Sequence, residues 1–190
     1  QQTLAGVSQP TLYWNNHDMA RIATRVAKTQ TQAKSLAMLM YLQRGIPVIY
    51  YGEELGLKNL HFDNVDQFED QTVGPWLKDA EKVIGKDKAL AMVSDTHKLP
   101  ARGPMPWNDT KNHGFTEGTP WINGTSQNDA TVASEVNADG SMFTFYKDML
   151  ELKREALFQD GTYYMISTDK DSYVYQRDLN DESAIVAVSL

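Results

Sequence analysis

The sequence of 190 residues contains no cysteine, so it forms neither a disulfide nor a thiolate site. It also has no run of about 18 apolar residues, the length that a membrane-spanning helix requires, and we expect no membrane partner. No basic segment followed by a long apolar run opens the chain, which argues against a signal peptide. The first residue is not methionine, and we expect the chain to belong to a longer polypeptide.

Several kinds of ligand site are also missing from the sequence. The four histidines lack the spacing of zinc ligands, and the Asp-rich stretch 63–70 lacks the pattern of a calcium-binding loop. There is no glycine-rich phosphate loop and no Gly-x-Ser-x-Gly elbow. We therefore expect no metal and no cofactor. The formal charge of −7, with acidic residues scattered along the chain, argues against nucleic acid as a partner.

An alternation of strand and helix patterns predicts an α/β fold near the start of the chain. Residues 11–15 and 46–52 have the β-branched and aromatic content of strands. The segment 31–45 between them has a helical pattern, and its apolar run 36–42 predicts burial on nearly every side. Gly45 is placed to end this helix as a left-handed cap. A strand, helix, strand unit predicts parallel pairing of the two strands.

Polar side chains follow both predicted strands. The sequence Asn-Asn-His-Asp occupies 15–18, and Glu53 and Glu54 follow the second strand. In barrels of parallel strands, the chemistry lies at the carboxyl ends of the strands. By residue type the two glutamates are candidates for a general acid or base. The alternative, which we favour, is that they orient loops and bind arginine side chains.

The rest of the chain divides into long loops, one helix and three strands. The polar stretch 57–100 reads as a surface insertion with short helical patterns at 76–84 and 87–95. The stretch 99–129 is too long and irregular for a simple connector, which favours a functional loop. An amphipathic helix with Ser141 as its N-cap is predicted over 141–157. Strand patterns joined by short turns then follow at 161–168, 172–179 and 183–190.

Four motifs occur in a fixed order along the chain, NNHD (15–18), RGIPVIYYGEELG (44–56), ARGPMPWNDTKNHGFT (101–116) and GTPWI (118–122). Together they resemble the C-terminal part of family 13 glycoside hydrolases, the α-amylase-type barrels. The oligo-1,6-glucosidase and dextran-glucosidase (glucan 1,6-α-glucosidase) branch fits best. The resemblance implies the end of a (β/α)8 TIM barrel in residues 1–158, about strands 7 and 8 with the closing helix. It implies the first strands of an antiparallel β-domain in 159–190.

The resemblance also implies roles for three residues. Asp18 matches the family's aspartate that stabilises the oxocarbenium-like transition state, and His17 matches the histidine that hydrogen-bonds the same sugar. Arg102 matches the arginine of the family's R-T-P-M-Q-W motif, which helps to hold the terminal glucose in the exo-acting branch. General chemistry supports the roles of Asp18 and Arg102, because a carboxylate stabilises positive charge developing at an anomeric carbon, and an arginine fork binds vicinal hydroxyls. The motif departs from the family at Gly103 and Pro106, and we expect these departures to alter fine substrate specificity.

Two further consequences concern partners. The expected substrate is an α-glucan oligosaccharide or disaccharide, and Trp107 and Trp121 either stack on its sugar rings or pack their own loop. Retaining glycosidases need a nucleophile and a general acid/base about 5 Å apart. In this family both lie on strands 4 and 5, and nothing here matches their motifs. We therefore expect the 190 residues alone to be inactive, and to pair with the missing N-terminal part of the same polypeptide or to self-associate.

Three functions stay open at this point. The first is a cytoplasmic α-glucosidase that hydrolyses α-1,6-linked gluco-oligosaccharides with retention. The second is a transglycosylase, or a sucrose or maltose isomerase, of the same family, which product analysis would separate from the first. The third is a non-catalytic glucan-binding relative, against which the intact His17 and Asp18 argue.

Overall fold

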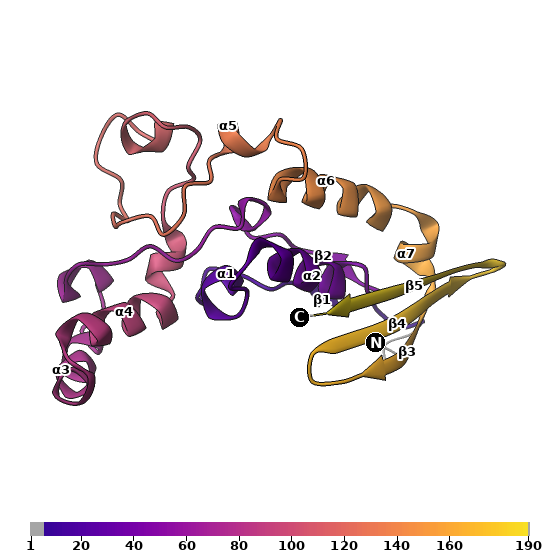
Figure 1. Cartoon of the computed structure of the whole chain (residues 1–190), viewed down its shortest axis with the longest axis horizontal. Coiled ribbons are helices and arrows are strands. Elements are labelled where there is room, and N and C mark those ends of the chain that lie inside the picture. The colour runs from indigo at the N-terminus through magenta and orange to yellow at the C-terminus, as the bar shows by residue number, and fades with distance from the viewer. Residues whose placement is uncertain (1–5, 190) are drawn as a thin grey trace.

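The structure is a computed structural model that describes residues 6–189. Its long axis runs from a helical hairpin at one end to a three-stranded sheet at the other, with α2, β1 and β2 between them (Figure 1). The helices and strands are β1 (Thr11–Leu12), α1 (Ile22–Arg25), α2 (Gln30–Tyr41), β2 (Ile46–Pro47), α3 (Val73–Ile84), α4 (Lys86–Thr96), α5 (Val132–Glu135), α6 (Met142–Lys153), α7 (Ala156–Asp160), β3 (Thr162–Thr168), β4 (Ser172–Leu179) and β5 (Glu182–Ser189). Four 3-10 turns are η2 (Glu53–Leu55), η3 (Val65–Phe68), η4 (Leu99–Arg102) and η5 (Lys111–Gly114).

Strands β1 and β2 pair in parallel, as the strand, helix, strand pattern predicted. Both are much shorter than the predicted 11–15 and 46–52. The chain leaves the ladder early because the Trp14 N–H donates to the Tyr41 hydroxyl (3.3 Å) instead of to β2. Apolar side chains on and beside this pair, among them Ile46 and Val48, are about half exposed.

The predicted cap at Gly45 is wrong, because α2 ends earlier. Leu42 is its C-cap in the right-handed region, with φ −85°. Gly45 has φ +145° and lies against the first strand, where an added Cβ would be 2.5 Å from the Pro10 carbonyl oxygen. Glycine is therefore needed at this position for the close approach of β2 to β1.

Helix α2 packs against both α6 and β5, so the helices and the antiparallel sheet share one core. The predicted helix 141–157 begins as expected, since the Ser141 hydroxyl accepts from the Thr144 N–H (3.1 Å). It is interrupted after Lys153, because Glu155 is extended (ψ 144°), and α7 follows as a separate helix. Buried members of this core include Leu36, Ala37, Tyr41, Met142, Tyr146, Met149, Tyr175, Val186 and Val188.

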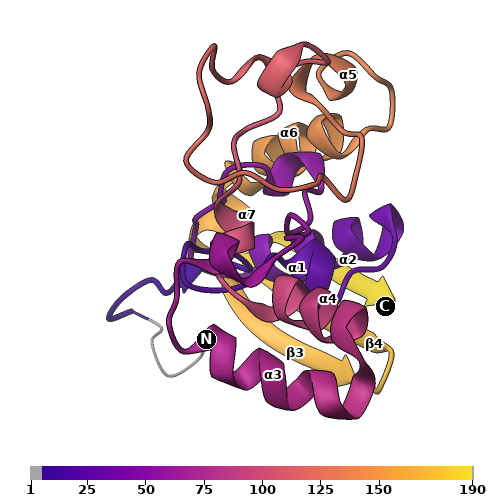
Figure 2. The same cartoon turned by 90° about the vertical axis from the view of Figure 1, so that its left-hand side faces the viewer.

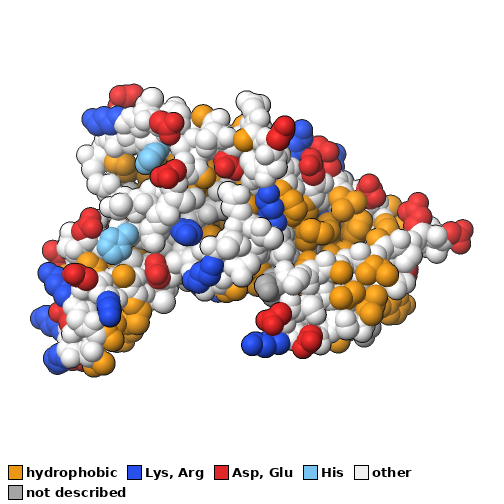
Figure 3. Space-filling model, in the orientation of Figure 1, with side chains coloured by type: hydrophobic (Ala, Val, Ile, Leu, Met, Phe, Trp, Pro, Cys, Tyr) orange, Lys and Arg blue, Asp and Glu red, His pale blue; other side chains and the backbone are white. Residues whose placement is uncertain are grey.

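The predicted helical patterns at 76–84 and 87–95 are confirmed as α3 and α4, which form a hairpin with its own apolar core. Figure 2 shows this hairpin beside the body of the molecule, with the loop that precedes α5 above it. The three predicted strands are confirmed as an antiparallel meander, β3-β4-β5. Apolar side chains gather over this sheet and beside α6 (Figure 3). Within residues 6–189, no helix has the length and apolar character needed to cross a bilayer.

Two buried cations join the helices to the sheet. Lys153 Nζ donates to the carbonyl oxygens of Gln43 (2.5 Å) and Phe158 (2.7 Å). Arg177 on β4 is fully buried, and its guanidinium binds carbonyl oxygens at the ends of α2 and α7 and at the start of β3. Both side chains thereby satisfy carbonyl groups that helix ends leave without partners.

Lys153 makes the stability of this contact between the helices and the sheet depend on pH. Burial, with the neighbouring Arg177, lowers the pKa of Lys153 from its ordinary 10.5 to about 8. Between these values the unfolded chain binds more protons than the folded one, so the free energy of unfolding rises with pH. We expect the wild-type protein to gain stability relative to Lys153→Met between pH values of about 8 and 10, measured by urea unfolding. A difference that stays constant with pH would contradict this, and the exposed Lys147→Met is the control.

Candidate active site

Asp18 lies in the turn that follows β1. Its backbone N–H donates to the Asn16 Oδ1 (2.8 Å), an Asx turn that presents the Asp18 carboxylate to solvent. The carboxylate side chain is 59% exposed, and its Oδ2 lies 3.0 Å from the His17 Nε2. The predicted strand-end residues His17 and Asp18 therefore contact each other in an open part of the surface.

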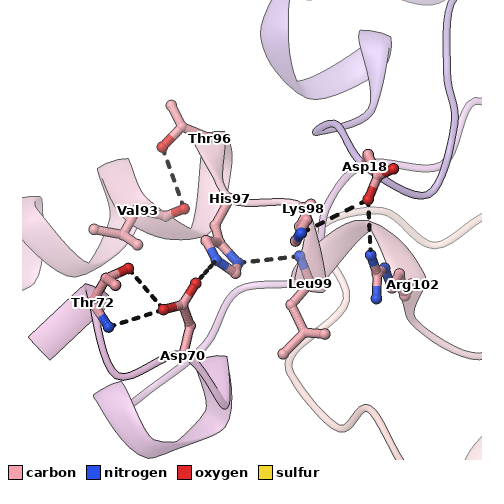
Figure 4. A network of polar contacts seen from close by, with 9 residues as sticks. All are labelled: Asp18, Asp70, Thr72, Val93, Thr96, His97, Lys98, Leu99 and Arg102. Atoms are coloured by element: carbon pink, nitrogen blue, oxygen red, sulfur yellow. Dashed lines mark hydrogen bonds and ion pairs between the residues drawn. The ribbon is translucent and has the colours of Figure 1, made fainter.

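Arg102 reaches the same place from 84 residues further along the chain. Its Nε donates to the His17 carbonyl oxygen (2.8 Å), and its Nη2 lies 3.4 Å from the Asp18 Oδ1. Lys98 Nζ lies 3.7 Å from the same oxygen (Figure 4). The structure thus brings together all three residues that the sequence singled out. Lys98 was not predicted, because it lies outside the motif at 101–116, four residues before Arg102.

Glu53 supports the turn that contains Asp18 through hydrogen bonds to buried groups. Asn15 is buried, its Oδ1 accepts from the Ile22 N–H (2.5 Å), and its Nδ2 donates to Glu53. The same carboxylate accepts from the hydroxyls of Tyr41 and Tyr146, the latter at 2.9 Å. Burial raises the pKa of Glu53, and these three donors oppose that shift. Both oxygens of Glu53 accept hydrogen bonds from buried groups, which agrees with the interpretation that Glu53 orients a loop.

Glu54 has a different environment, beside a buried arginine. Arg21 is stacked over the rings of Tyr50 and Tyr51, 5.0 and 4.9 Å from their centroids, and donates to the Tyr51 carbonyl oxygen (2.7 Å). Burial raises the pKa of Glu54, and its backbone hydrogen bonds and the positive charge of Arg21 oppose that rise. Glu54 also lines a largely apolar cleft of about 500 Å³ with Arg102, Trp107 and Trp121.

The two tryptophans of the functional loop remain accessible. Trp107 is 49% exposed and Trp121 is 67% exposed, so neither is packed away inside the loop. The Trp121 Nε1 donates to the Glu69 carboxylate (3.2 Å), which fixes the orientation of its ring. Whether they stack on sugar rings stays a prediction.

Asn59 connects the two halves of the site, a role that was not predicted from the sequence. It is fully buried, and its Oδ1 accepts from the Arg21 N–H (2.9 Å) on the Asp18 side. Its Nδ2 donates to the carbonyl oxygens of Ser94 (2.8 Å) and His97 (3.1 Å) on the Lys98 side. One amide thereby sets the distance between the turn after β1 and the end of α4.

The arrangement can bind a polar, uncharged ligand through hydrogen bonds and stabilise positive charge beside it. A carboxylate with two cations and an imidazole offers both acceptors and donors to vicinal hydroxyl groups. Among the described residues, no group of three or more His, Asp or Glu side chains is arranged to hold a metal ion.

The chain is similar to known proteins over nearly its whole length. The family model "Alpha amylase, catalytic domain" matches residues 1–161. The oligo-1,6-glucosidase of Halalkalibacterium halodurans is 32% identical over 98% of this chain. A solved structure described as a family GH13_31 enzyme is 80% identical, with a TM-score of 0.96 over 99% of this chain. The trehalulose synthase of Pseudomonas mesoacidophila is 28% identical over 99% of this chain, with a TM-score of 0.84.

The three relatives are all much longer than this chain. The chain spans about a third of the length of these relatives, 35% of the glucosidase, 35% of the GH13_31 enzyme and 36% of the synthase. The family match nevertheless includes most of the chain, together with every residue of the candidate site. This chain therefore belongs to the α-amylase catalytic-domain family, glycoside hydrolase family 13.

Proposed function

We propose that the protein contributes to an α-glucosidase that releases glucose from α-1,6-linked gluco-oligosaccharides with retention of configuration. In this proposal Asp18 stabilises the oxocarbenium-like transition state, and His17 and Arg102 bind hydroxyl groups of the same glucose unit. The cytoplasmic location stays a prediction from the sequence resemblance.

The observation that supports these roles best is the convergence of Asp18 and Arg102 on one spot from distant parts of the chain. Arg102 contacts both the Asp18 carboxylate and the His17 backbone, so one guanidinium fixes the relative positions of the two other residues. Substrate binding can exchange the exposed ion pairs for hydrogen bonds to sugar hydroxyls at little cost, because such pairs contribute about 0–1 kcal/mol.

We further propose that the nucleophile and the general acid/base lie outside these 190 residues, in the remaining part of the barrel. Both oxygens of Glu53 already accept buried hydrogen bonds, and the ion-pair partners of Asp18 within residues 6–189 are all cationic or histidine side chains. The half-exposed apolar residues beside β1 and β2 suit further parallel strands, or a second copy of the chain. In this view β1 and β2 belong to barrel strands 7 and 8, and residues 159–190 open an antiparallel domain.

Turnover of isomaltose and maltose tests whether the nucleophile and the general acid/base lie outside these 190 residues. We expect the 190-residue chain to release no glucose from either sugar, alone or as Asp18→Asn. Glucose release that depends on Asp18 would mean that the two carboxyl groups lie inside this chain, and this proposal would be wrong. The measurement is glucose produced over time, with the oligo-1,6-glucosidase of Halalkalibacterium halodurans as a positive control for isomaltose.

A second candidate is an isomerase that transfers the glucosyl group within a disaccharide instead of to water. The likeness to a trehalulose synthase supports it, since that fold matches with a TM-score of 0.84. Product analysis with sucrose separates the two, because an isomerase yields a new disaccharide and a hydrolase yields free glucose.

A further inference from the structure

His97 occupies the junction between α4 and η4, the turn that ends at Arg102. Its side chain is largely buried, 17% exposed, and the ring packs edge-on against Phe68 with centroids 5.3 Å apart. Figure 4 shows the imidazole between Asp70 on one side and the backbone of Leu99 on the other. The ring thus sits directly behind the turn that contains Lys98 and Arg102.

Both ring nitrogens have a partner. Nδ1 accepts from the Leu99 N–H (3.2 Å), and Nε2 lies 3.4 Å from the Asp70 Oδ2. Because Nδ1 is an acceptor, the proton of the neutral ring is on Nε2, where it points at Asp70. Asp70 is itself held, since its Oδ1 accepts from the N–H (2.9 Å) and the hydroxyl (2.7 Å) of Thr72. These donors, with His97, hold the pKa of Asp70 below its ordinary value.

The bond to Leu99 supplies the cap that η4 otherwise lacks. Leu99 is the first residue of the turn, and Lys98 in the N-cap position makes no side-chain cap hydrogen bond to the described residues. The first N–H groups of a helical turn have no partner inside the turn. The imidazole of His97 provides that partner, and Asn59 holds the His97 carbonyl oxygen from the opposite side.

We propose that His97, oriented by Asp70, is a positioning residue that fixes the turn 98–102 so that Lys98 and Arg102 meet Asp18. His97 does not touch the substrate in this proposal. Its importance for sugar binding rests on the proposed function, whereas its effect on the position of Arg102 does not.

Two substitutions separate capping from simple packing. In His97→Asn the side-chain oxygen can accept from the N–H two residues ahead, as asparagine does in an Asx turn, so the cap is kept. In His97→Phe the ring can still pack against Phe68, but no acceptor remains. If His97 acts by packing, His97→Phe should preserve the position of Arg102 better than His97→Asn does. If His97 acts as a cap, His97→Asn should preserve it better.

The readout is the NMR signal of the Arg102 Nε–H, which is bonded to the His17 carbonyl oxygen in the 190-residue chain. We expect His97→Asn to keep the wild-type shift. We expect His97→Phe to move it toward the value of a solvated arginine and to speed hydrogen exchange at the Leu99 N–H about tenfold or more. Amides of β4 should stay unchanged in both variants. An unchanged Arg102 signal in His97→Phe would overturn the proposal.

A third variant keeps the test decisive if His97→Phe fails to fold. Asp70→Ala leaves the imidazole in place but removes one of the two groups that set its tautomer, the other being the Leu99 N–H. We expect the ring nitrogen shifts to change from a single Nε2–H tautomer to a mixture, with faster exchange at the Leu99 N–H. A ring that keeps one tautomer and an equally protected Leu99 N–H would refute the role of Asp70.

Titration of the wild-type chain with isomaltose distinguishes this proposal from the proposed function. Shifts at Asp18 and Arg102 on addition of the sugar support the proposed function only, and the His97 variants decide the role of His97. An absence of shifts counts against the proposed sugar site, while the two sets of variants still decide the role of His97.

Discussion

Asp18→Asn is expected to lower glucose release from isomaltose by about 10³-fold in a complete barrel that contains this chain. Such a barrel is made by placing residues 1–190 in the GH13_31 enzyme that is 80% identical, in place of its matching segment. The substitution keeps the size of the side chain and one acceptor oxygen, but it removes the negative charge. An interaction that exists mainly in the transition state should reduce kcat and kcat/KM together.

Asp63→Asn is the matched control for this measurement. Asp63 is also an exposed aspartate, 68% accessible, and it is paired with a histidine, His61. Its removal changes the net charge by the same amount, so a similar loss of rate in both variants would point to general electrostatics. A rise in KM with an unchanged kcat in Asp18→Asn would contradict the assigned role, because it would mean that Asp18 only binds the ground state.

The parts of this site that could be predicted from the sequence are those that a motif identifies directly. Asp18, His17 and Arg102 belong to short motifs whose order along the chain is informative, and the structure places them together. The parallel pairing of β1 and β2 followed from a strand, helix, strand pattern. In both cases the signal is local and the fold only has to bring the segments together.

The supporting residues could not be predicted, because their roles depend on contacts between distant segments. Asn59 is one asparagine in a polar insertion, and nothing in its neighbourhood shows that its amide spans two segments. The histidine at 97 has the same problem, since its partner Asp70 lies 27 residues away. The predicted helix cap at Gly45 was wrong for a related reason. Glycine after a helix usually marks a cap, but here it serves the close approach of a strand.

The second large effect is expected from Glu53→Leu, which should lower the free energy of unfolding by about 3–5 kcal/mol. The substitution leaves three buried donors without an acceptor, the hydroxyls of Tyr41 and Tyr146 and the amide of Asn15. Each such buried group costs about 1–3 kcal/mol. Glu53→Gln should cost less, because one oxygen remains to accept from the tyrosines. Urea unfolding at pH 7 measures both variants, and the exposed Glu151→Leu serves as the control.

A combined variant shows whether orphaned donors or altered packing causes this loss. Removing both tyrosine hydroxyls together with the carboxylate, in Glu53→Leu with Tyr41→Phe and Tyr146→Phe, leaves two donors unpaired instead of three, the Asn15 amide and the Trp14 N–H. Replacing both partners of a buried hydrogen bond by apolar groups is nearly neutral, so the triple variant should be more stable than Glu53→Leu alone. Strictly additive losses would instead mean that the leucine disturbs the core. The Asn15 amide is unpaired both in Glu53→Leu and in the triple variant. The turn that contains Asp18 should therefore be less ordered in both, and the triple variant should bind sugar no better than Glu53→Leu although it is more stable.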